Sequence, residues 1–361
     1  MASAREIGLL FRHATILSYI SCGGKTLMSY RPAFRAALVF LAMTQIQAQN
    51  ADPKNALLVI EKGVASLAIV DPVAGKLAAS VPEGGVTGHE VAASADGRFA
   101  YVPIYGDSGV GLPGTNGRNM VVIDVASHKV TGNVDFGHGV RPHLPVWGPD
   151  GLLYVTTELD NSVTIVDPQT LKIVGTIPTN QPESHMLAIS HDGKRGYTAN
   201  VGPGTVSVLD LKARKTIAVI PVSKKTQRIS ISEDDRLVFT ADQTKPQLAV
   251  IDTGTNKVKT WIPLPGLGYG SAPTPDGKWL LIALPNAAKV AVIDLSTMKL
   301  ARTIDVPPAP QAVLIRPDGK VAYASCDASN QVAEIDLATW KVTRLISTGK
   351  SPDGMAWAQS K

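Results

Sequence analysis

The sequence is poor in cysteine, in aromatic residues and in charge. Its 361 residues include only 2 Cys, and aromatic residues make up 5% and charged residues 18% of the chain. So few cysteines exclude a disulfide framework and a structural zinc site of the CxxC type. No apolar run is long enough to cross a bilayer as a helix. Because 44% of the residues are hydrophobic, the chain can still bury a core, which excludes general disorder.

Several catalytic signatures are also missing. The sequence contains no G-x-S-x-G nucleophile elbow, no H-E-x-x-H zinc motif and no CxxCH heme-attachment motif. A GxGxxG pattern runs from Gly109 to Gly114, but no helix is expected after it. Phosphate binding by such a loop needs the amide groups of a helix N-terminus, so we interpret the pattern as a flexible loop. Cys326 is expected to be a buried small residue.

The N-terminal region has the layout of an export signal. Arg31 and Arg35 precede a short apolar stretch, residues 36–43, and Ala48 ends a passable cleavage sequence. Positive charge, a short apolar core and a small residue in this order are typical of a secretory signal peptide. The sequence therefore predicts a signal peptide over residues 28–48 and a periplasmic or secreted protein.

Residues 1–27 are then interpreted as an upstream extension, and residues 49–361 as the folded protein. The basic side chains are concentrated before residue 49, where the chain has five of them against one acidic side chain. The remainder has 30 basic and 29 acidic side chains, which is nearly neutral. Nucleic acid is therefore disfavoured as a partner. We expect a monomer without a transmembrane span.

A β-branched run that ends in aspartate recurs seven times after the leader. The steps between successive aspartates are 53, 43, 43, 42, 42 and 42 residues. Six turns centred on an aspartate alternate with these runs, and five of them read Asp-Gly. Asp-Gly between apolar runs is a strong hairpin signal, because glycine adopts positive φ without strain. The seven run-ending residues are Asp71, Asp124, Asp167, Asp210, Asp252, Asp294 and Asp336.

This period predicts an all-β fold, a seven-bladed β-propeller with four-stranded blades. Each unit of about 42 residues has room for four short strands, which is typical of a propeller blade. Residues 56–82 supply only the last three strands of a unit, and residues 351–358 supply only a first strand. We expect the two chain ends to complete one blade together, because this closure removes an open sheet edge.

Three segments carry a family resemblance. They are Tyr154-Val-Thr-Thr157, Tyr197-Thr-Ala-Asn200 and Tyr323-Ala-Ser-Cys326, each just after a turn. Together with the Val-x-Val-Ile-Asp strand, they resemble the YVTN-repeat β-propeller family over residues 55–360. The resemblance implies a secreted or periplasmic propeller. Similar seven-bladed propellers include lactonases, a streptogramin lyase and the copper-bearing domain of nitrous oxide reductase, and fold alone does not choose among these functions.

One position of the repeat is polar in every blade. It lies five residues before the turn, at the start of the innermost strand, and three successive blades have histidine there. Innermost strands line the central channel, so these side chains are expected to ring one mouth of it. Around the ring they are His89, His143, His185, Gln227, Tyr269, Gln311 and Asp353.

Ring closure is expected to place Asp353 beside His89. Three imidazoles and one carboxylate form a suitable ligand set for a divalent metal, with Zn, Cu, Fe and Mn not distinguished. The alternative interpretation is that the ring is only the polar lining of a solvated mouth. Gln227 and Gln311 are candidate ligand contacts, and a polar lining alone also accounts for them.

Further candidates lie in connections that should open onto the same mouth. Glu158 and Tyr105 each end the second strand of a blade, and a glycine-rich insertion, Gly106–Arg118, follows Tyr105. Arg118 and Arg141 are candidate anion contacts. Glu90 is expected to point away from the channel, because successive side chains of a regular strand alternate between faces.

Two functions from different classes fit this pattern. In the first, a metal bound by the histidines polarises a carbonyl or activates water, Glu158 acts as general acid or base, and Tyr269 donates a hydrogen bond. The reaction would be hydrolysis or elimination on a small ester, lactone or sugar. In the second, the propeller is a non-catalytic scaffold for a protein, a glycan or a small ligand. A cofactor-carrying propeller has the least support, because heme and copper motifs are missing.

Overall fold

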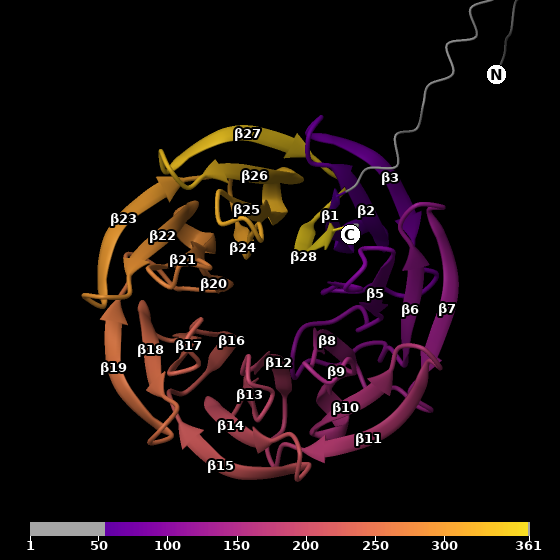
Figure 1. The fold of residues 1–361 in the computed structure, drawn as a ribbon, viewed down its shortest axis with the longest axis horizontal. Coiled ribbons are helices and arrows are strands. Elements are labelled where there is room, and N and C mark those ends of the chain that lie inside the picture. The colour runs from indigo at the N-terminus through magenta and orange to yellow at the C-terminus, as the bar shows by residue number, and fades with distance from the viewer. Residues whose placement is uncertain (1–54, 360–361) are drawn as a thin grey trace, which may run out of the picture. The chain divides into compact units, whose positions relative to one another are not determined.

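The computed structural model describes residues 55–359, which form a ring of seven four-stranded antiparallel sheets (Figure 1). The predicted all-β propeller with seven blades is thus confirmed. The predicted extension, the predicted signal peptide and Cys22 lie outside the described residues. Among the described residues, no helix is long and apolar enough to span a membrane.

Six blades are continuous in sequence, and their strands follow one another from the channel outward. Blades 1 and 2 comprise β4 (Ala92–Ala93), β5 (Phe99–Pro103), β6 (Asn119–Asp124) and β7 (Lys129–Asp135), then β8 (Pro142–Trp147), β9 (Leu153–Thr157), β10 (Ser162–Asp167) and β11 (Lys172–Pro178). Blades 3 and 4 comprise β12 (Ser184–Ile189), β13 (Arg195–Asn200), β14 (Thr205–Asp210) and β15 (Lys215–Pro221), then β16 (Thr226–Ile231), β17 (Leu237–Asp242), β18 (Gln247–Asp252) and β19 (Lys257–Pro263). Blades 5 and 6 comprise β20 (Ser271–Pro273), β21 (Trp279–Leu284), β22 (Lys289–Asp294) and β23 (Lys299–Asp305), then β24 (Pro310–Ile315), β25 (Val321–Cys326), β26 (Gln331–Asp336) and β27 (Lys341–Ser347).

The seventh blade joins the two ends of the described chain. Its strands, in spatial order, are β28 (Pro352–Gln359), β1 (Asn55–Glu61), β2 (Ser66–Asp71) and β3 (Lys76–Pro82). β28 pairs antiparallel with β1, with Trp357 opposite Leu57 and Met355 opposite Val59. This confirms the predicted closure, in which the two ends of the described chain complete one blade.

Burial follows the position of a strand within its blade. In blade 1, five of the six residues of β6 are buried, whereas the outermost strand β7 buries only Val134. The β-branched runs found in the sequence are therefore the hydrophobic centre of each blade, where Val and Ile pack well on a pleated surface. Burying one such side chain stabilises the fold by about 1.5–3 kcal/mol.

The connections divide between the two faces of the ring. In the six continuous blades, the innermost strand ends at an aspartate turn on one face, so the starts of innermost strands and the ends of second strands meet on the other face. We call that other face the histidine face. The insertion Gly106–Arg118 opens onto it. So do four single-turn 3-10 helices, η1 (Lys62–Val64), η2 (Glu158–Asp160), η3 (Pro285–Ala287) and η4 (Asp327–Ser329).

Candidate functional site

Three imidazoles form one cluster at the histidine face. His143 on β8 and His185 on β12 are 1% and 3% exposed, and His89 is half-buried in the segment before β4. The ring centroids of His143 and His185 lie 3.6 Å apart, and those of His89 and His143 lie 5.5 Å apart. The three rings are therefore neighbours, as expected for equivalent positions of successive blades. We call these three residues the histidine cluster.

Glu158 connects the cluster to its surroundings. Its carboxylate is 1% exposed at the start of η2, and its Oε2 accepts hydrogen bonds from the Tyr105 hydroxyl at 2.7 Å and from His185 Nδ1 at 3.0 Å. Its Oε1 lies 3.7 Å from Nη1 of Arg141 and accepts no hydrogen bond from the described residues. Glu158 and Tyr105 thus lie at the mouth, as their register predicts.

The environment keeps the imidazoles neutral. Burial lowers the pKa of His89 to about 3, and burial also lowers the pKa of His143 and of His185. Burial opposes ionisation of Glu158, but the hydrogen bonds from His185 and Tyr105 and the charge of Arg141 outweigh it and lower the Glu158 pKa. An ionised carboxylate can only accept, so Nδ1 of His185 carries the proton and Nε2 keeps its lone pair.

A second network crosses the channel. Arg228 on β16 is 5% exposed, and its guanidinium pairs with Glu90 of blade 1 and, at 2.8 Å, with Asp353 of blade 7. Lys62 of η1 lies 2.9 Å from the other oxygen of Asp353, and the Arg228 guanidinium lies 4.9 Å from the centre of the Tyr269 ring. Asp353 therefore serves as a partner of two cations. Burial raises its pKa, but Arg228 and Lys62 outweigh this and lower it.

The prediction that Glu90 points away from the channel is wrong. Its side chain is buried and faces Arg228 across the ring. Alternation does not apply because Glu90 precedes the short strand β4 and is not part of a regular strand. Across the channel, Arg228 lies at a register shift between Gln227 and Ile229 and takes a φ of +60°. In blade 7, a side chain at Gly354 would collide with Glu90, so this glycine leaves the space that Glu90 fills.

Sequence reasoning also missed Arg228 and Lys62. Arg228 stands in the repeat position that is Gly270, Ala312 and Gly354 in the three following blades. A long cation among small residues on an innermost strand was the available signal. The prediction rests on the preceding position of the repeat, which is polar in every blade, and therefore does not include Arg228.

The other predicted residues have local partners. Gln227 donates to the Tyr269 hydroxyl at 2.8 Å, and Gln311 donates to the Ala309 carbonyl at 3.3 Å. Arg118 is exposed and pairs with Asp135 on the outermost strand β7, at 2.6 Å. Their roles in ligand binding, and that of Arg141, stay predictions.

No group of three His, Cys, Asp or Glu side chains within residues 55–359 is arranged to hold a metal ion. Cys326 is fully buried, as expected, and burial raises its pKa to about 12. The donors of the histidine face are thus neutral imidazoles in one cluster and carboxylates that already have partners.

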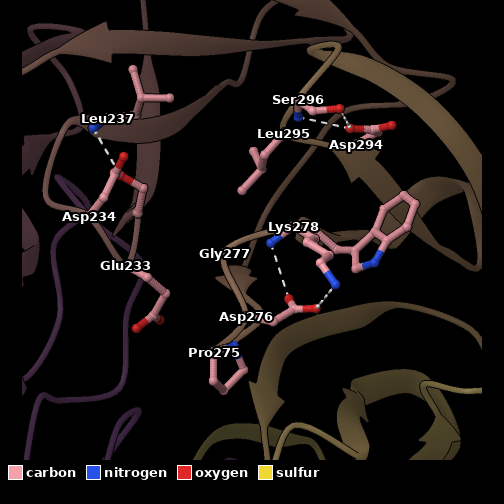
Figure 2. Close-up of a pocket in the computed structure, with 12 residues that line it drawn as sticks. Glu233, Asp234, Leu237, Pro275, Asp276, Gly277, Lys278, Asp294, Leu295 and Ser296 are labelled. Atoms are coloured by element: carbon pink, nitrogen blue, oxygen red, sulfur yellow. Dashed lines mark hydrogen bonds and ion pairs between the residues drawn. The ribbon is translucent and has the colours of Figure 1, made fainter.

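Two hollows show where side chains leave space. A cleft of about 600 Å³ lies on the histidine face, between the insertion and blades 2 and 3, and Glu158 and Arg141 line it. A hollow of about 700 Å³ lies between the aspartate turns of blades 4 and 5, on the opposite face (Figure 2). Its carboxylates cap turns: Asp276 accepts from the Lys278 amide at 3.1 Å and Asp294 from the Ser296 amide at 2.8 Å. Since such turns recur around the ring, we interpret this second hollow as structural.

Solved structures with a similar fold include two enzymes. Hydrazine synthase of Kuenenia stuttgartiensis superposes with a TM-score of 0.66 at 22% identity, over 76% of this chain and 90% of the other. Dihydro-heme d1 dehydrogenase NirN, in a complex with DHE, superposes with a TM-score of 0.61 at 18% identity, over 84% of this chain and 75% of the other. These similarities establish the fold.

Sequence comparison gives the family. The chain matches no curated protein. The model of the cytochrome D1 heme domain family matches residues 147–359, which is more than half of the sequence and runs from β8 to β28. The protein therefore belongs to the cytochrome D1 heme domain family.

Proposed function

We propose that this propeller binds a heme-type tetrapyrrole at its histidine face, with an imidazole of the histidine cluster as the iron ligand. The observation that carries the proposal is the pair formed by His185 and Glu158. A histidine that ligates iron usually donates its other ring N–H to a carboxylate or carbonyl, which fixes the ring and its tautomer. His185 has this arrangement. Its Nδ1 lies 3.0 Å from the Glu158 carboxylate, and the lone pair of its Nε2 is left to bind iron.

The remaining donors of the site also suit such a group. His143 is buried, and its Nδ1 has no hydrogen-bond partner among the described residues. The tetrapyrrole itself supplies four nitrogens, so its iron needs only one or two ligands from the protein. This requirement is smaller than that of a bare ion held by three or four side chains. When bound, the group would supply redox chemistry at its iron.

The chain's own residues would hold and orient that group. Burial keeps the pKa of the imidazoles low, so they stay unprotonated and available as ligands at neutral pH. The Tyr105 ring is fully buried and lies 4.6 Å from the His89 ring, between centroids, so it packs against the histidine cluster. The cations Arg228 and Lys62 are both neutralised by carboxylates.

Metal-assisted hydrolysis receives less support from this geometry. Glu158 is held ionised by three neighbours, so it has no proton to give as a general acid. Tyr269 accepts from Gln227 and packs against Arg228, and Asp353 pairs with two cations. The hypothesis of a cofactor-carrying propeller has the least support in the sequence alone, and it is now the best supported hypothesis. The periplasmic or secreted location stays part of the proposal.

Titration with ferric heme b (hemin) tests this function. We expect saturable binding of one equivalent with a shifted Soret band in the wild-type protein, and loss of that shift in His185→Ala. His191→Ala is the matched control, because His191 is an exposed histidine on an aspartate turn and pairs with Asp235. Absence of saturable binding, or equal spectra for the His185 variant and the wild type, would refute the proposal.

A further inference from the structure

We propose that the insertion Gly106–Arg118 is a strap that fixes the ligating imidazole of His185, with Arg141 and Glu158 as positioning residues between them. The inference rests on the proposed heme site and adds a physical link from an outer loop to its iron ligand. The insertion is the one place where the distance between successive aspartate runs grows to 53 residues. In a repeat protein, an added segment on one face is often functional.

The strap has internal order despite its glycines. The Thr115 amide donates to Asp107 at 2.6 Å, and the Leu112 amide donates to the Gly109 carbonyl at 3.1 Å. Its base is tied to blade 1, where the Gly117 amide donates to the Tyr105 carbonyl at 2.8 Å. A side chain at Gly117 would collide with the Ile104 carbonyl, so only glycine permits this close approach.

The Arg141 side chain is hydrogen-bonded to the strap. Its Nη2 donates to the Leu112 carbonyl at 2.7 Å, its Nε to the Asn116 side chain at 2.7 Å, and its Nη1 to the Gly109 carbonyl at 3.3 Å. The side chain of Arg141 is 4% exposed, so these acceptors replace water as its partners. A planar guanidinium satisfies three fixed acceptors at once, which the single ammonium of lysine does not.

The same guanidinium faces Glu158. Nη1 of Arg141 lies 3.7 Å from Oε1 of Glu158, and the Arg141 carbonyl accepts the Glu158 amide at 3.3 Å. The other carboxylate oxygen accepts from Tyr105, the residue that precedes the strap, and from His185. The strap is therefore linked to Glu158 by two indirect routes, one through Arg141 and the other through Tyr105.

A shift of the strap is consequently expected to reach His185. If the carbonyls of Gly109 and Leu112 move, Arg141 loses the partners that hold it beside Glu158, and the carboxylate loses its fixed orientation. The cleft of about 600 Å³ between the strap and blades 2 and 3 gives the loop room to move. The strap would thereby set the strength and geometry of iron ligation.

Arg141→Lys is the decisive variant, because it keeps the positive charge but replaces the planar guanidinium with a single ammonium group. We expect hemin to bind about 10-fold or more weakly, with a Soret band shifted from that of the wild type. Arg98→Lys is the matched control, since Arg98 is exposed beside an aspartate turn on the opposite face and pairs with Asp124. It should behave as wild type in both measurements.

Two measurements without heme separate this inference from the proposed function. In the apo-protein, Arg141→Lys should speed amide hydrogen exchange in residues 106–118 and shift the NMR signal of the His185 ring. Failure of the wild-type protein to bind hemin would refute the heme site, while these two readouts still decide whether the strap controls His185. The inference is overturned if Arg141→Lys matches the wild type in strap exchange and in the His185 signal.

Discussion

Oε2 of Glu158 lies 3.0 Å from Nδ1 of His185, in a site where both side chains are almost fully buried. Because the carboxylate is ionised, this contact places the proton on Nδ1 and directs the lone pair of Nε2 away from Glu158. Glu158 thus decides which nitrogen of His185 is available to a metal.

Glu158→Gln should weaken heme binding without removing the ligand. An amide group does not specify the tautomer of His185 as an anion does, and it leaves Arg141 without its counter-charge. We expect the affinity for hemin to fall about 10- to 100-fold, as is usual when an outer-shell carboxylate is removed. Glu233→Gln is the control, because Glu233 lies 3.7 Å from exposed His191 on the other face. An unchanged affinity in Glu158→Gln would speak against its orienting role.

Arg228→Met should destabilise the fold strongly. The substitution leaves Glu90 without its cation and Asp353 with only Lys62, in a buried part of the channel. Removing one partner of a buried ion pair costs about 3–5 kcal/mol. Chemical denaturation in urea measures the difference. Arg118→Met breaks an exposed pair and should cost at most about 1 kcal/mol, so equal losses in the two variants would contradict a special role for the Arg228 network.

Glu83→Gln should stabilise the protein at neutral pH. Glu83 is buried in the segment that leads to His89, its Oε2 accepts the Gly88 amide, and burial raises its pKa to about 7. The folded state therefore binds this proton more tightly than the unfolded chain. The stability due to Glu83 is present below about pH 4.5 and is lost as the pH rises through 7.

The advantage of Glu83→Gln should accordingly grow between pH 5 and pH 8, to about 3 kcal/mol, because each unit of pKa shift corresponds to about 1.4 kcal/mol. Thermal or urea unfolding at both pH values measures this. Glu183→Gln, at a half-exposed glutamate on the histidine face, serves as the control. A pH-independent difference between Glu83→Gln and the wild type would rule the prediction out.

The fold was predictable from the sequence because a propeller repeats local information. The aspartate runs and Asp-Gly turns mark every blade, so the spacing alone gave the number of blades and the closure of β28 against β1. The same register placed His89, His143 and His185 together, since equivalent residues of neighbouring blades lie side by side.

The partners of those residues were less predictable. The register could not show that Asp353 is held by Arg228 and Lys62. Arg228 belongs to a blade three places away around the ring, and Lys62, although in the same blade as Asp353, comes from the other end of the chain. Glu90 was misplaced because the innermost strand of blade 1 begins only at Ala92, so strand alternation does not extend to Glu90. The missing CxxCH motif counted against heme, although it excludes only covalent attachment.

Electron paramagnetic resonance of the hemin complex tests the central claim most directly. The wild-type complex should show an iron with an imidazole ligand in addition to the porphyrin nitrogens, and His185→Ala should lose that signature and regain it when free imidazole is added. Restoration by imidazole would show that the variant keeps its fold and lacks only the ligand. A spectrum of His185→Ala identical to that of the wild type would contradict the account.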